Sequence, residues 1–136
     1  MRMSCHHCSP TKLGVDVAGR YIPDRNDIVF LDFEPTKGKE IGKYRPALVL
    51  SSKVYNQRSG LLICCPISTS IRGAATEVPI SNLESPSVVA SNLINTLDWS
   101  ERKVKKVAEA EHGVMEEVIL RLIPLIGADQ VISDIE

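Results

Sequence analysis

A few side chains in this sequence have types and spacings that suit chemistry on a phosphodiester. The acid Glu40 precedes the cation Arg45 by five residues, and Pro46 follows Arg45 at the start of an apolar run. A guanidinium carries a planar fork of N–H donors that matches two phosphate oxygens. A hydroxyl could complete the contacts to those oxygens, and Ser68 and Thr69, just after another apolar run, are the candidates.

RNA can be cut without a metal ion if its own 2′-OH attacks the neighbouring phosphate. That reaction needs a base for the hydroxyl, an acid for the leaving 5′-oxygen and a cation for the developing charge. Arg45, fixed at the start of a strand, would suit the role of the cation. The simpler interpretation is that residues 34–46 form a solvated charged loop and that both hydroxyls are ordinary polar groups at a strand end.

Short apolar runs separated by turn residues predict five to seven short strands around this segment. The predicted strands cover residues 28–33, 47–50, 61–67 and 76–80. Residues 88–97 predict a strand pair or one bent strand, and residues 104–110 a last strand or the beginning of a helix. The stretch 34–44 predicts a long loop, and 55–60 a polar, turn-rich connection.

The last third of the chain predicts a helix. Val114, Val118 and Leu122 recur every four residues, which gives one apolar stripe. The same pattern predicts that Met115, Ile119 and Ile126 widen the stripe, that Pro124 bends the last turn and that Gly127 ends it. The fold class predicted is therefore mainly β, a small barrel with a C-terminal α-helix. Residues 1–20 are interpreted as a flexible N-terminal extension or tag, and 21–136 as one domain.

Composition narrows the classes of function. Among 136 residues the net charge is −1, which disfavours a duplex-DNA binder with a broad basic surface, and aromatics are 4%, too few for an extended base-stacking platform. The cations are gathered instead, at Lys37, Lys39 and Lys43 near Arg45, and again between residues 102 and 106. No apolar run has the length of a membrane span, so we expect a cytoplasmic protein.

The cysteines and histidines indicate no second chemistry. Cys64 and Cys65 lie in an apolar run and are predicted to be core residues that point to opposite faces of a strand. The cluster Cys5-His6-His7-Cys8 has the spacing of half a zinc site but lacks a second half, so we expect no metal. Walker, dinucleotide-binding and metalloprotease motifs are absent, and His112 has no obvious nucleophile as a partner.

These segments together resemble the MazF/PemK family of toxin endoribonucleases. The resemblance covers residues 21–127 and is most specific in the block from Asp32 to Ser51, which contains the run Asp32-Phe33-Glu34-Pro35-Thr36-Lys37-Gly38 and the run from Arg45-Pro46-Ala47 to Ser51. It continues through Tyr55-Asn56 and Ser68-Thr69 and, at the end, through Leu125-Ile126-Gly127.

The resemblance implies a fold, a reaction and partners. The fold would be an SH3-like barrel with a C-terminal helix, assembled as a homodimer. The reaction would be metal-independent, cofactor-free cleavage of single-stranded RNA, often mRNA, at short sequences, leaving a 2′,3′-cyclic phosphate and a 5′-OH. A MazE/PemI-like antitoxin would block the site, and DNA would be contacted only through the toxin–antitoxin complex.

The resemblance also assigns roles to residues. Arg45 would be the catalytic cation and acid, Glu40 the loop carboxylate and Ser68 the residue at the position of a catalytic threonine. The implied RNA-binding residues are Lys37, Lys39, Lys43, Thr69, Asn92 and Asn95.

Two departures from the family pattern leave other functions open. Serine replaces threonine at position 68, and the segment Asn92 to Thr96 lacks the usual Asp-Gln pair and the basic residue after it. The alternatives are a binding toxin of the same fold, of the type that inhibits DNA gyrase, and a catalytically weakened relative that acts in autoregulation.

Overall fold

The computed structural model describes residues 20–33 and 44–135, and this part of the chain contains seven strands and three helices. The strands are β1 (Asp27–Asp32), β2 (Tyr44–Val49), β3 (Leu61–Ser68), β4 (Glu77–Ile80), β5 (Ser87–Ala90), β6 (Asn95–Asp98) and β7 (Lys105–Glu109). The helices are α1 (Lys53–Ser59), α2 (Val114–Leu125) and α3 (Ala128–Ile135).

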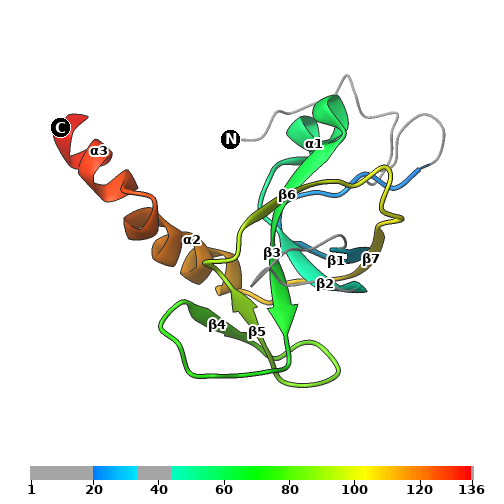
Figure 1. Ribbon diagram of the computed structural model, residues 1–136, viewed down its shortest axis with the longest axis horizontal. Coiled ribbons are helices and arrows are strands. Elements are labelled where there is room, and N and C mark those ends of the chain that lie inside the picture. The colour runs from blue at the N-terminus through cyan, green and yellow to red at the C-terminus, as the bar shows by residue number, and fades with distance from the viewer. Residues whose placement is uncertain (1–19, 34–43, 136) are drawn as a thin grey trace.

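The strands form one antiparallel sheet that curls into a half-barrel (Figure 1). Its order is β4-β5-β3-β2-β1-β7, with β6 paired to β3 beside this path. The long strand β3 is the centre, because it pairs with β2 on one edge and with β6 and then β5 on the other. In Figure 1, α1 lies at one end of β3 while β4 and β5 lie at the other. The predicted mainly-β fold class with a C-terminal helix is confirmed.

Both faces of the sheet are covered, which explains the continuous apolar runs of its strands. One face packs against α2, in a cluster that includes Leu48, Val89 and Val118. We call this cluster the helix-side core. The other face packs against Trp99 and Ile22, and we call it the Trp99-side core.

The adjacent cysteines Cys64 and Cys65 lie in the core, on opposite faces of β3, as the sequence predicted. Cys64 belongs to the Trp99-side core and Cys65 to the helix-side core, and both are fully buried free thiols. Burial raises the pKa of Cys65 to about 12, and it raises the pKa of Cys64 well above the ordinary range, with a smaller contribution from Cys65. A raised pKa keeps each thiol neutral at physiological pH, and the neutral thiol is a poor nucleophile.

These thiols should therefore report on unfolding. At pH 8 we expect iodoacetamide to leave Cys64 and Cys65 unmodified in the folded protein and to alkylate both in concentrated urea, as measured by peptide mass spectrometry. Alkylation in the folded protein as fast as in urea would contradict their burial.

The C-terminal region differs in part from the prediction. Val114, Val118 and Leu122 form the buried stripe of α2 as predicted, and Met115 packs against it. The predicted widening of the stripe is wrong at Ile119 and Ile126, which are 40% and 72% exposed. Gly127, at φ +75°, ends α2 as predicted, but a further helix, α3, begins directly after it. Figure 1 shows α2 and α3 extending away from the sheet.

Helix α1 lies where the sequence predicted only a polar connection. Its local signals are a capping serine, Ser52, whose side chain accepts the N–H of Tyr55, and Gly60, at φ +74°, at its end. The helix is held by Asn56, which is completely buried. Its side-chain amide donates to the carbonyl of Pro23 at 2.8 Å and accepts from the Ser51 hydroxyl at 2.5 Å.

Replacing Asn56 should destabilise the fold, because Asn56→Ala leaves the buried Ser51 hydroxyl and the Pro23 carbonyl without this partner. Each unsatisfied buried group costs about 1–3 kcal/mol, so we expect a loss of about 3 kcal/mol in the free energy of unfolding. Urea denaturation measures it. The control Gln57→Ala changes an exposed residue of the same helix and should stay within about 0.5 kcal/mol. Equal effects of the two variants would contradict the role of Asn56.

For two segments the sequence left a choice between alternative secondary structures, and the structure decides both. Residues 88–97 contribute to two strands, β5 and β6, which each pair with β3, rather than to one bent strand. Residues 104–110 contain β7 rather than a helix start. The Cys5-His6-His7-Cys8 cluster lies outside the described residues, and so does the predicted extension at 1–20 except for its last residue, Arg20. Within the described ranges, no helix has the length and apolar character needed to cross a membrane.

Candidate active site

Arg45 is the second residue of β2, two positions before the first buried residue of that strand, Ala47. It is half-buried and pairs in register with Leu31 of β1, and the next pair joins Pro46 to Phe30. The neighbouring Tyr44 is 54% exposed and stacks on Phe30, with 5.3 Å between the ring centroids. The pairing of β2 with β1 therefore fixes the position of the Arg45 backbone.

Ser68 is the last residue of β3 and is also half-buried. It pairs in register with Val88 of β5, and its Oγ accepts the backbone N–H of Ser70 at 3.0 Å. This hydrogen bond uses the hydroxyl as an acceptor, so its own proton remains available to donate.

The register of β2 and β3 relates the two residues. The residue pairs of β2 and β3 run from Val49 with Cys64 to Ala47 with Pro66, and Arg45 and Ser68 lie two residues beyond the last pair, each in its own strand. Since side chains alternate along a strand, both belong to the face of the sheet that carries the Trp99-side core. The structure therefore brings the predicted cation and hydroxyl to the same face and the same end of neighbouring strands.

The other predicted residues fall into two groups. Asn95 opens β6 and pairs with Cys64, so it shares the face of Ser68, and its side-chain amide donates to the carbonyl of Leu93 at 3.0 Å. Thr69 is exposed just after β3, and Asn92 is exposed in the turn between β5 and β6. The predicted residues Glu40, Lys37, Lys39 and Lys43 lie outside the described residues.

Two members of the second cluster of cations, at residues 102–106, make contacts with acidic residues or backbone carbonyls. Lys106 lies 3.0 Å from the Glu109 carboxylate and 3.5 Å from that of Asp27, and the hydrogen bond to Glu109 is the main reason that its pKa is raised. Arg102 donates to the carbonyl of Asp32 at 2.7 Å. Lys106 and Arg102 therefore hold the strand β1 to its neighbours.

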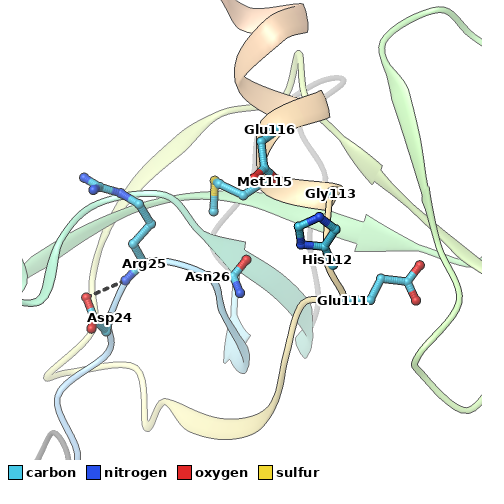
Figure 2. Close-up of a pocket in the computed structure, with 8 residues that line it drawn as sticks. All are labelled: Asp24, Arg25, Asn26, Glu111, His112, Gly113, Met115 and Glu116. Carbon is cyan, nitrogen blue, oxygen red and sulfur yellow. Dashed lines mark hydrogen bonds between the residues drawn. The ribbon is translucent and has the colours of Figure 1, made fainter.

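Two cavities lie outside the predicted site. One of about 490 Å³ is bordered by Asp32, Tyr44 and Arg102. The other, of about 330 Å³, lies where β1 approaches the start of α2 and includes His112 and Arg25 (Figure 2). Among residues 20–33 and 44–135, no hydroxyl or thiol side chain lines this second cavity, so none of them provides a nucleophile for His112 there.

Sequence reasoning assigned no role to Glu77, an acid that binds the backbone of the connection after Ser68. The carboxylate of Glu77 accepts the backbone N–H groups of Arg72 and Gly73. The resemblance to the MazF/PemK family extends through Glu77-Val78 but gives this acid no role, and a glycine four residues before an acid is too common a pattern to be diagnostic.

Comparison with known proteins identifies the class. The profile of the family described as PemK-like, MazF-like toxin of type II toxin-antitoxin system matches residues 24–126. The endoribonuclease toxin MazF of Escherichia coli K12 is 32% identical over 111 residues, which are 82% of this chain and 100% of that protein. The chain therefore belongs to the PemK-like, MazF-like toxin family.

Solved structures agree with this assignment. The crystal structure of MazF from Deinococcus radiodurans has a TM-score of 0.75 and 39% identity, and the match covers 79% of this chain and 98% of that one. A MazE-MazF crystal structure from the same organism has a TM-score of 0.70 and 39% identity, covering 79% of this chain and 97% of that one. The predicted resemblance to the MazF/PemK family is confirmed.

Proposed function

We propose that this chain, an endoribonuclease of the MazF/PemK toxin family, cuts single-stranded RNA without a metal ion and thereby inhibits translation and growth. The products would be a 2′,3′-cyclic phosphate and a 5′-OH, and cleavage would occur at a short sequence. The observation that carries the proposal is the placement of Arg45 and Ser68 on one face, at the same end of β2 and β3.

The chemistry follows from what each group can donate or accept. The guanidinium of Arg45 offers several N–H donors to the non-bridging oxygens, which gain negative charge as the 2′-oxygen attacks the phosphorus. The hydroxyl of Ser68 donates a further hydrogen bond to the same oxygens. Glu40 would accept the proton of the 2′-OH, and Arg45 would serve as the acid that donates a proton to the 5′-oxygen as the P–O bond breaks. The exchange of one P–O bond for another needs no water, so the cyclic phosphate is its direct product.

The RNA strand would follow polar groups on the same face. Asn95 shares the face of Ser68, Thr69 is exposed directly after Ser68, and Asn92 is exposed in the turn between β5 and β6. Lys37, Lys39 and Lys43 would supply further phosphate contacts.

The proposal includes partners. The MazE-MazF complexes among the structural neighbours support a cognate MazE/PemI-like antitoxin as a partner of this chain. We further propose a cytoplasmic homodimer that reaches DNA only through the toxin–antitoxin complex.

The test is cleavage of a long RNA in EDTA, followed by mapping of the ends. We expect 5′-OH ends and 3′ ends that resist extension until the cyclic phosphate is removed. Loss of cleavage in EDTA would refute the metal-independent mechanism. Absence of cleavage together with inhibition of DNA gyrase would refute the nuclease and favour a binding toxin.

A further inference from the structure

The connection between β3 and β4, residues 69–76, follows Ser68 directly and is held by the acid at its far end. The Glu77 carboxylate accepts the N–H of Gly73 at 2.9 Å and the N–H of Arg72 at 3.2 and 3.3 Å. Gly73 has φ +78°, a left-handed conformation that lets successive N–H groups converge on one anion. Glu77 therefore fixes the shape of the tip of this connection.

The rest of the connection is fastened from other elements. Arg121 of α2 donates its Nε–H to the carbonyl of Ala75 at 2.9 Å, and its own guanidinium is held by Glu117 at 2.6 Å. The carbonyl of Thr76 accepts both the N–H and the hydroxyl of Ser91. An exposed connection with so few buried residues would ordinarily be among the most mobile parts of a fold, so these hydrogen bonds determine its conformation.

The side chain that this arrangement presents is Arg72. It is exposed, and among the described residues its guanidinium has no ion pair or hydrogen bond. Arg72 is four positions after Ser68 in the chain, so the two Cα atoms are at most about 14 Å apart even in a fully extended chain. A long cationic side chain at this distance can reach a phosphate that neighbours the one being cut.

We propose that Glu77 is a positioning residue for RNA binding: it holds residues 72–73 so that Arg72 contacts a backbone phosphate beside the cleavage site. The inference rests on the proposed cleavage of RNA and adds a residue to its binding surface. Arg72 makes the contact, and Glu77 acts only through Arg72.

The direction in which RNA affinity changes when the Glu77 carboxylate is removed distinguishes a positioning role from simple charge repulsion. A carboxylate repels the RNA backbone, so removing a negative charge near the site would by itself strengthen binding. If Glu77 positions Arg72, removing the carboxylate weakens binding instead. Glu84, exposed in the connection between β4 and β5 and without a hydrogen bond or ion pair among the described residues, is the matched control for the charge.

The experiment measures binding of a 2′-O-methyl RNA that contains the cleavage sequence and cannot be cut, by fluorescence anisotropy at several salt concentrations. We expect Glu77→Ala to raise Kd about fivefold, Glu77→Gln to have a smaller effect, and Glu84→Ala to leave Kd unchanged or lower it. One lost phosphate contact lowers the slope of log affinity against log salt by about 0.7 for a single strand. We expect this loss of slope in Arg72→Ala and equally in Glu77→Ala.

The double variant decides whether Glu77 acts through Arg72. In Arg72→Ala, the additional change Glu77→Ala should add no further loss of affinity. Amide resonances of Arg72 and Gly73 should shift in Glu77→Ala with the melting temperature kept. Tighter binding by Glu77→Ala, or additive losses in the double variant, would overturn the inference. Failure of the wild-type protein to cut RNA would refute the proposed function separately, because binding is measured on an RNA that is never cut.

Discussion

Replacement of Arg45 by alanine is expected to lower the rate of RNA cleavage by about a thousandfold or more. The guanidinium lies near the start of β2, on the face shared with Ser68, where it can meet the negative charge that develops on the phosphate. Removing a cation that stabilises the charge on a transferring phosphoryl group typically costs this much. Single-turnover cleavage of a short labelled RNA measures the loss.

Two further variants separate charge from geometry at this position. Arg45→Lys keeps the charge but loses the planar fork, so we expect a rate between those of the wild type and the alanine variant. Arg58→Ala removes the same charge from an exposed position on α1, at the opposite end of β3, and should cleave normally. Normal cleavage by Arg45→Ala would remove this residue from the mechanism.

Replacement of Ser68 by alanine is expected to slow cleavage by at least about a hundredfold, which is the usual cost of losing one contact to a developing oxyanion. Ser68→Thr should retain or improve the rate, because threonine keeps the hydroxyl and restricts χ1 more than serine does. The same single-turnover assay measures both variants.

The fold should survive these changes at Ser68. The hydrogen bond that Ser68 accepts comes from the N–H of Ser70, an exposed residue whose amide water can solvate. Thr96→Ala, which removes an exposed hydroxyl from β6, is the control and should leave the rate unchanged. Full activity of Ser68→Ala would transfer the role to Thr69 or to neither residue.

The parts of the fold predictable from sequence are those governed by apolar periodicity. The strands with buried cores and the stripe Val114, Val118 and Leu122 were found because burial repeats with the period of the backbone. Helix α1 was missed because its only buried residue is polar Asn56, so no apolar stripe marks it. Helix α3 was missed because it buries nothing, and Ile119 was misplaced because α2 packs along a narrow stripe.

The candidate site was predictable only in its residue types. The guanidinium of Arg45 and the hydroxyl of Ser68 suggested phosphodiester chemistry, but their relation depends on the pairing of β2 with β3, which a single sequence does not specify. Glu77 escaped notice because its role consists of hydrogen bonds to backbone N–H groups, and backbone conformation leaves little trace in residue type.

The pairing of β1 with β7 has a consequence for how the protein folds. β1 is the first strand of the described chain, and one of its two edges pairs with the last strand, β7, beginning with Asp27 opposite Glu109. Such distant pairing must overcome the entropy of closing a long loop, which makes folding slow compared with helical proteins of this size. On the ribosome, the second edge of β1 therefore stays uncovered until all the other strands, β2 to β7, have been made.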